Sequence, residues 1–338
     1  MATLTPGAVY PVNAPYNTSP SLSGVFIPNL WADKLLVKFY ENTMLTQVCN
    51  TDYEGMFKSK GDSVRIRKRP DINIRPYEIG MNLQYEVPTP DYLDMQIDQG
   101  FYFGVKVSDV LQYQADRDLM NMFTDEAAKQ MKIAVEEEVF YHAYATVGPH
   151  PDNEGSTAGA LSAAYNLGSD TAPVDESDPN EVLAAILRMS SVLDEQNIPP
   201  DGRFLIISPY DRHLLLQTNI AATFFSGDST SMQRTGKIGT LDRFTVYVSN
   251  LLPRAEAGKA YVQARTATST GAAVSGAKAR RMMIGGTKHA LSFAASIEKT
   301  EPMRDPTDFG DLVRGLSIYG RKIIVPEALV ITQVGSAT

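Results

Sequence analysis

Two segments with alternating side chains, separated by a turn-rich stretch, constrain the fold of this chain more than any other feature. In the first segment Val64 and Ile66 alternate with arginines until Pro70. In the second, apolar side chains occupy alternate positions through most of residues 93–107. A period of two is typical of β-strands, because successive side chains of a strand point to opposite faces. The pattern predicts an extended antiparallel hairpin over residues 56–107, too long to lie inside a compact core.

Charge is segregated along this predicted hairpin. Residues 56–76 carry seven basic residues against two acids, and residues 77–127 carry ten acids against two basic residues. The pattern favours ion pairs across the strands or contacts with an acidic neighbouring subunit. The candidates for these contacts are Arg65, Arg67, Arg69, Asp94 and Asp98. A basic strand also suggests nucleic-acid binding, but aromatic side chains are sparse here and the net charge of the chain is −8, whereas nucleic-acid-coating proteins are normally basic.

The N-terminal segment has the opposite character, because the first 32 residues contain no Asp, Glu, Lys or Arg. It is rich in Thr, Ser, Asn and Pro as far as Leu22. Such a segment forms no helix and buries little by itself. It is therefore either a free tail or an extended arm that becomes ordered on a neighbouring subunit. Helical spacing then predicts a short helix from Asn29 to about Asn42.

A long helix is predicted from a cap at Ser108 to about Ala145, because apolar side chains recur there every three or four residues. We expect a break near Gln114 and a start of the final stretch at Thr124. Three consecutive glutamates lie within this helix: Glu136, Glu137 and Glu138. Consecutive helix positions point in different directions, so these side chains cannot converge on one metal ion. They predict a surface that faces solvent or a neighbouring subunit.

The C-terminal half has an α/β pattern. Residues 148–178, rich in Gly, Ala, Ser and Asp, predict a linker or exposed loop. Pro179 then opens a helix, 204–207 is a continuous apolar run typical of a buried strand, and a further helix is expected over Tyr210–Gln217. Further strands are predicted at Phe244–Val248, Met282–Ile284, Ala290–Ala294, Leu316–Tyr319 and Ile323–Val325 with Leu329–Ile331.

No motif in the sequence points to catalysis, a cofactor or a metal. Cys49 is the only cysteine, which excludes an intrachain disulfide and a Cys-based zinc cluster, and we expect it to pack as a small apolar side chain. The four histidines lie far apart, and neither a nucleophile elbow nor a phosphate loop is present. No apolar run approaches the ~18 residues of a membrane span, and no signal peptide is visible. We therefore expect a non-enzymatic, cytoplasmic chain that contacts copies of itself; an α/β hydrolase using scattered carboxylates is the remaining enzyme hypothesis.

Five stretches carry a resemblance to a known family. They are Leu35–Thr43, Gly61–Ile66, Arg203–Pro209, Gly239–Phe244 leading to Ser249-Asn250, and Leu316–Lys322 before Pro326-Glu327. Through them the chain resembles tailed-bacteriophage major capsid proteins of the HK97-like fold, over most of residues 25–335.

The resemblance implies an α+β, HK97-like capsid fold with an N-terminal arm, an extended β-hairpin loop, a peripheral domain with a spine helix, and an α/β axial domain. The implied boundaries are 1–28 for the arm, 29–55 for the short helix and connection, 56–107 for the loop, 108–165 with 280–320 for the peripheral domain, and 170–279 with 321–338 for the axial domain.

The resemblance also implies a function. Such a protein self-assembles, as hexamers and pentamers, into an icosahedral head that encloses double-stranded DNA, with which it makes weak, non-specific contacts. A separate scaffolding protein is expected, because no long charged helical leader is present, together with portal and possible decoration proteins and no membrane. The expected location is the virion capsid, assembled in the host bacterial cytoplasm. An encapsulin-like shell of a cellular protein compartment is the alternative.

Overall fold

A computed structural model describes residues 43–53, 63–70, 72–89, 91–109, 119–145, 149–169, 172–218, 239–255, 280–307 and 309–335. The chain divides into two compact units, Met1–Phe39 and Tyr40–Thr338, and every described residue belongs to the second. The predicted N-terminal arm and the helix predicted over 29–42 therefore lie outside the described residues.

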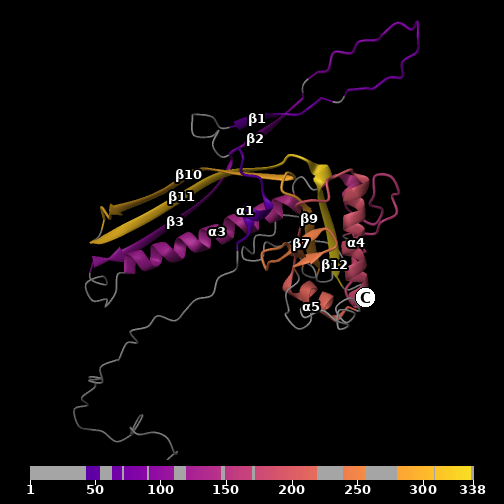
Figure 1. The fold of residues 1–338 in the computed structure, drawn as a ribbon. Helices are drawn as coiled ribbons and strands as arrows, with labels where there is room; N and C mark the ends of the chain where they lie inside the picture. The colour runs from indigo at the N-terminus through magenta and orange to yellow at the C-terminus, as the bar shows by residue number, and fades with distance from the viewer. Residues whose placement is uncertain are drawn as a thin grey trace, which may run out of the picture. The chain divides into compact units, whose positions relative to one another are not determined.

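The described elements are mixed helices and strands (Figure 1). The helices are α1 (Leu45–Val48), α3 (Leu119–Ala145), α4 (Pro179–Glu195) and α5 (Pro209–Gln217), with short 3-10 turns η2 (Pro151–Asn153) and η3 (Pro326–Ala328). The strands are β1 (Ser63–Arg67), β2 (Tyr92–Gln96), β3 (Gln99–Ser108), β4 (Val174–Asp175), β5 (Arg203–Ile207), β6 (Thr240–Leu241), β7 (Phe244–Val248), β8 (Arg254–Ala255), β9 (Arg280–Thr287), β10 (Leu291–Arg304), β11 (Gly310–Ile323) and β12 (Leu329–Gly335).

A seven-stranded sheet forms the middle layer of one lobe. Its strand order is β4-β12-β9-β5-β7-β6, with β8 paired to β9, and it mixes parallel and antiparallel pairs. Buried side chains of α4 and α5 share one cluster with one face of the sheet. Buried side chains of α1 and of the C-terminal half of α3 share a second cluster with the other face. The lobe is therefore a three-layer α/β structure.

Strand β5 shows why the buried strand is a continuous apolar run. Leu205 and Ile207 join the cluster with α4 and α5, whereas Phe204 and Ile206 join the cluster with α3 and α1. Successive side chains of a strand point to opposite faces, so a strand buried on both faces has no place for a polar residue. The predicted strand at 204–207 is confirmed.

Local capping signals place the next two helices correctly. The Asp178 side chain accepts the N–H of Asn180, and Pro179 lies in the first turn of α4. The Ser208 side chain accepts the N–H of Asp211 at the start of α5. These caps satisfy backbone donors that have no partner within the helix, so both helices begin where the sequence predicts.

Helix α3 spans Leu119–Ala145 and so ends where predicted. Ser108 is the last residue of β3, and Asp109 directly after it is already helical, so a helix starts where Ser108 was expected to cap one. Residues 110–118, which include the expected break, lie outside the described residues. Thr124 is inside the helix, where its hydroxyl donates to a carbonyl one turn earlier, so it does not start a new stretch.

A three-stranded antiparallel sheet, in the order β10-β11-β3, contacts α3 through β3 and β11 (Figure 1). β10 and β11 have 14 residues each. The strands predicted at Ala290–Ala294 and Leu316–Tyr319 are therefore pieces of two much longer strands. Lys106 of β3 forms an ion pair with Asp305 at 2.5 Å, next to the turn that joins these long strands.

The second arm of the predicted hairpin is not one strand. β2 pairs with β1, while β3 pairs with β11 in the three-stranded sheet. The prediction of a continuous arm over 93–107 is therefore wrong, because the hairpin ends at Gln96 and the strand is interrupted at Ile97 and Asp98. The chain crosses β11 there so closely that a Cβ on Gly320 would lie 2.6 Å from the carbonyl oxygen of Gln96.

The segment expected to be a linker or exposed loop, 148–178, is largely irregular where the structure describes it, and residues 160–164 are exposed, as an exposed loop requires. It is not a free linker, however, because other parts of it pack on the seven-stranded lobe. Leu167 is fully buried in the cluster shared with α4. The buried side-chain amide of Asn153 donates to the carbonyl oxygens of Glu327, at 2.7 Å, and Leu329, at 2.9 Å. The small residues of this segment permit tight turns rather than flexibility, since Gly159 and Gly168 both have positive φ.

Substituting Gly320→Ala is expected to destabilise the subunit by about 1–3 kcal/mol, because the new methyl group displaces the backbone of Gln96. Chemical denaturation monitored by circular dichroism measures this loss. Gly104→Ala, in β3 of the same sheet, is the matched control, since no atom lies within 4 Å of its added Cβ. Equal effects of the two substitutions would contradict the close crossing.

Candidate functional site

One antiparallel register runs through residues Ser63–Gln96, which we call the ribbon. In each residue pair between β1 and β2 the two sequence positions sum to 159, as for Ser63 and Gln96 (63 and 96). The same register continues beyond both strands, because the N–H of Lys68 donates to the carbonyl of Asp91 at 2.8 Å. The predicted antiparallel hairpin is thus confirmed over this range, although regular strand structure is confined to its base.

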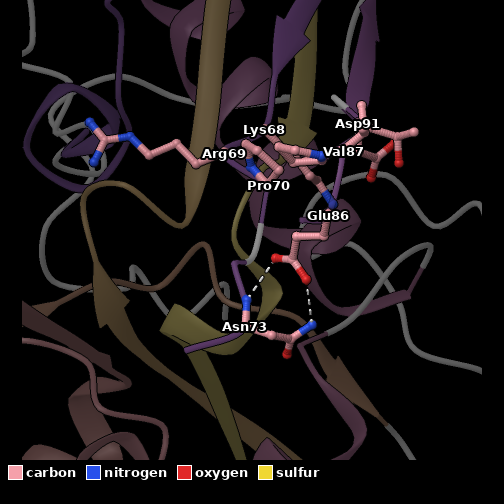
Figure 2. Close-up of a pocket in the computed structure, with 9 residues that line it drawn as sticks. Lys68, Arg69, Pro70, Asn73, Glu86, Val87 and Asp91 are labelled. Atoms are coloured by element: carbon pink, nitrogen blue, oxygen red, sulfur yellow. Dashed lines mark hydrogen bonds between the residues drawn. The ribbon is translucent and has the colours of Figure 1, made fainter. Parts of the chain in front are cut away.

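Side-chain bonds hold this register farther along the ribbon. The backbone N–H of Asn73 donates to Oε1 of Glu86 at 2.8 Å, and its side-chain amide donates to Oε2 at 3.2 Å (Figure 2). These two bonds lower the pKa of the Glu86 carboxyl. Arg75 donates to Gln84, the next opposite residue on the same face. Both pairs again add up to 159.

The ribbon closes at a turn over Glu78–Met81, where the N–H of Met81 donates to the carbonyl of Glu78 at 3.3 Å. Gly80 has φ of 91°, a conformation that glycine adopts at no steric cost. Pro70 and Pro88 have no N–H to donate, which limits the backbone ladder. The arms leave a hollow of about 500 Å³ here, lined by both cations and carboxylates, including Lys68 and Glu86 (Figure 2).

The register assigns each ribbon side chain to one of two faces. The first face is polar and includes Arg65, whose guanidinium donates to Asp94 at 2.9 Å and lies 4.2 Å from the Tyr92 ring. This confirms the predicted pairing of Arg65 with Asp94. Both side chains are exposed, so the pair fixes register more than it stabilises the fold.

The second face of the ribbon is apolar for most of its length. At its base Met95 and Ile66 are buried against Ala294 of β10, with Ile324 packed alongside. Farther out the same face carries large apolar side chains that are 63–92% exposed. They are Ile72, Ile74, Tyr85 and Val87. The face that the subunit covers at the base is therefore left uncovered toward the turn, and Ile79, in the turn itself, is 97% exposed.

Three other predicted contact residues have no ion-pair partner in the described part of the chain: Arg67, Arg69 and Asp98. Arg67 is exposed opposite Tyr92. Arg69 is exposed and lines the hollow. Asp98 lies beyond the paired strands, so the structure does not bring it to an arginine of β1.

The three glutamates of α3 do not form the solvent-facing or subunit-facing surface that the sequence predicts. Glu136 and Glu137 are only 1% and 3% exposed. Glu138 accepts a hydrogen bond from the Tyr319 hydroxyl at 3.0 Å and forms an ion pair with Arg321. The expectation is wrong because other elements of the subunit pack around α3. A glutamate on this helix can be buried where a hydrogen-bond donor or a cation of another element lies opposite its carboxylate.

Burial shifts the titration of several groups near Glu138. It raises the pKa of the Glu138 carboxyl, which Arg321 partly opposes. It also lowers the pKa of His142, one turn along α3, to about 4, with further lowering by Arg321 and Lys322. Neither ring nitrogen of His142 has a hydrogen-bond partner, so this histidine is neutral and structural near pH 7.

Glu136 points to a different part of the subunit. Its Oε2 accepts the backbone N–H of Met44 at 2.7 Å and that of Leu45 at 3.2 Å. Burial raises its pKa to about 7, because the two amide bonds only partly offset the loss of hydration. Glu136 also lines a hollow of about 430 Å³ between α1, α3 and the three-stranded sheet.

The described residues contain no group of three His, Cys, Asp or Glu side chains placed to hold a metal ion. Cys49 is buried, as predicted, and burial raises the pKa of its thiol. Among the helices that the structure describes, none is long and apolar enough to cross a membrane.

The buried glutamates and the register of the outer ribbon were missed by sequence reasoning. The signal for the ribbon was present, because the matched spacing of Asn73, Arg75, Gln84 and Glu86 about one turn is visible in the sequence. The burial of Glu136 left no such signal, since charged residues at consecutive helix positions usually face solvent.

A protein-family model described as phage capsid protein matches residues 93–331. Among solved structures, the chain is similar to one from Mycobacterium phage Che8, with 21% identity, a TM-score of 0.69, and coverage of 90% of this chain and 96% of that one. It is also similar to the capsid of cyanophage P-SCSP1u, with 14% identity, a TM-score of 0.67, and coverage of 93% and 94%.

A third similar structure is the mature capsid of bacteriophage PhiM1, with 14% identity, a TM-score of 0.64, and 92% of each chain covered. At these identities the likeness establishes the fold, which is the HK97-like α+β fold. The comparison with curated proteins returned no match.

Substituting Arg321→Met is expected to lower the free energy of unfolding by about 3 kcal/mol, because it leaves the buried Glu138 carboxylate without its cation. Urea denaturation measures the loss. Arg314→Met is the matched control in the same strand, since its pair with Glu301 is exposed and contributes about 1 kcal/mol or less. A loss for Arg321→Met as small as that of the control would show that the pair is not a buried one.

Proposed function

This chain belongs to the phage capsid protein family and is a structural protein of the virion capsid, and we propose that its copies form the hexamers and pentamers of an icosahedral head around double-stranded DNA. The observation that carries the proposal is the apolar face of the ribbon. It is buried at its base by Ala294 of its own subunit but exposed from Ile72 to the turn. Because isolated subunits rarely leave so much apolar surface in water, a neighbouring copy is its natural cover.

The ribbon also supports a specific mode of association. Two opposed arms in one register present a preformed surface, so little conformational freedom is lost when it docks. At ~25 cal/mol per Å² of buried apolar area, each such contact contributes several kcal/mol before association costs are subtracted. In a closed shell every subunit makes this contact, so the modest free energy of each contact is gained many times.

Charge supports the choice of neighbour. Arg67 and Arg69 have no ion-pair partner among the described residues and lie on the polar face of the ribbon, so we propose that they contact carboxylates of an adjacent copy. Asp98 remains a proposed contact of the same kind. Glu136, Glu137 and Glu138 are not proposed as contacts, because the subunit itself surrounds them.

We propose a domain division that follows the sheets. Residues 1–28 are the arm, 29–55 the connection, and 56–96 the extended loop. The peripheral domain contains α3 with the three-stranded sheet, and the axial domain contains the seven-stranded sheet with α4 and α5. β9, first expected in the peripheral domain, pairs with β5 and β12 and so falls in the axial domain.

The other partners are inferred from this role. We propose a separate scaffolding protein, a portal and possible decoration proteins, with assembly in the host bacterial cytoplasm. A net charge of −8 supports weak, non-specific contact with the packaged DNA, since a strongly basic subunit would hold phosphates tightly. The family match supports a phage head over an encapsulin-like compartment.

Purified full-length protein, alone or with its scaffolding protein, is expected to give closed particles or capsomer rings. Electron microscopy and light scattering measure this directly. A monomer that stays stable at high concentration, with or without scaffold, would contradict the proposed function.

The double substitution Ile74→Asn and Tyr85→Asn is expected to reduce particle yield at least tenfold and to change subunit stability by no more than ~0.5 kcal/mol. Both side chains are about nine-tenths exposed and lie opposite each other on the apolar face. The control is Asn82→Ser, an exposed position on the polar face of the ribbon, one pair nearer the turn. Normal particle yield from the double variant would exclude the apolar face as the contact.

A further inference from the structure

The described chain begins next to a buried carboxylate. Met44 and Leu45 are among the first residues that the structure describes, and they lie in the predicted connection, directly after the helix predicted over 29–42. Their backbone N–H groups both donate to Oε2 of Glu136, on α3. Met44 is 3% exposed and packs in the same buried cluster as Ile133 of α3. We call residues 43–45 the root of the N-terminal segment.

The surroundings of Glu136 do not balance its charge. Its other carboxylate oxygen, Oε1, is buried without any hydrogen-bond partner. The hollow beside it is lined mainly by apolar side chains, including Leu45, Val135 and Phe293. This carboxylate is therefore bonded on one side only.

The charged groups near Glu136 come from three elements. Lys132, one turn earlier on α3, and Lys299 of β10 line the same hollow. Lys288 lies in the turn before β10, and its charge lowers the pKa of the Cys49 thiol. Cys49 follows α1 and is itself buried near Glu136. Within the described part of the chain none of these lysines forms an ion pair with Glu136. Glu137, the next residue of α3, is also buried and adds no positive charge.

We propose that Glu136 is a positioning residue that fixes the root of the N-terminal segment to the spine helix α3, and that its ionisation regulates how firmly the root is held. The inference rests on the proposed function only in that the segment before the root is taken as an arm that contacts neighbouring subunits. The hold itself is a property of the single subunit.

The direction of the effect follows from linkage. Burial raises the pKa of Glu136 from its ordinary value of 4.5 to about 7 while the root is in place. When the root lifts off, the carboxyl becomes hydrated and its pKa returns toward the ordinary value. Protonation therefore favours the held root. The hold is strongest below about pH 4.5, weakens as pH rises toward 7, and changes little above that.

Hydrogen exchange of the full-length subunit between pH 5 and 8 tests the proposal, with each rate corrected for the intrinsic pH dependence of exchange. The protection of residues 43–48 in the wild-type protein is expected to fall more than tenfold over this range. In Glu136→Gln it is expected to stay constant, because the side-chain oxygen still accepts both N–H groups but carries no charge. In Glu136→Ala protection is expected to be low at every pH.

Asp125→Asn, an exposed acid on the same helix, is the matched control and is expected to keep the wild-type pH dependence. Protection of the buried strand β5 reports whether each variant is folded. A wild-type root with constant protection, or a Glu136→Gln variant with the wild-type slope, would overturn the proposal.

Particle yield supplies a second readout that a merely structural role would not move. Yield is expected to depend on pH between 5 and 8 in the wild-type protein and not in Glu136→Gln. Equal pH dependence of particle yield in both proteins would contradict a link between Glu136 ionisation and assembly. If no condition gives particles, the proposed function fails, while the exchange measurement on free subunits still decides whether Glu136 holds the root.

Discussion

The two-sided character of the ribbon is the constraint on which the rest of this structure depends. A single antiparallel register directs Arg65, Asn73 and Arg75 to one face and apolar side chains to the other. Bonds between opposite polar residues keep the register where prolines prevent a regular ladder. The apolar face can then be covered by its own subunit only at the base, at Met95 and Ile66. The proposed contact with a neighbouring copy thus follows from how far the register extends.

Helix α3 connects the three-stranded sheet at the base of the ribbon to the α/β lobe. Its C-terminal half packs on the seven-stranded sheet, while β3 and β11, which carry the crossing beneath the ribbon, pack along it. With 27 residues it spans about 40 Å, so one rigid element contacts both the seven-stranded and the three-stranded sheet. Gly320 permits the close crossing at the base, and a larger residue there would move the ribbon relative to this helix.

Local signals made much of the α/β lobe predictable from sequence. Prolines in the first turn, Pro179 and Pro209, indicated where two helices start, and an apolar run with no polar position identified β5 as buried. The interruption at Ile97 and Asp98 was not predictable, because the apolar side chains keep the same odd-numbered positions in β2 and β3, with only Gln99 breaking the series, while the pairing partner changes. A period reports which face a side chain occupies, but it does not report which strand lies alongside.

The burial of the α3 glutamates was also not predictable from a local sequence pattern, and the structure shows the physical reason. Consecutive positions on a helix differ by about 100° in direction, so Glu136 reaches α1 while Glu138 reaches β11. Neither partner lies near α3 in the sequence, so no local pattern reports the burial. The charge of Glu138 is compensated by an ion pair with Arg321. The Glu136 carboxylate accepts only two backbone N–H groups, and its other oxygen has no hydrogen-bond partner. A carboxyl left in that condition responds to pH near neutrality, and it does so where it holds the backbone of residues 43–45.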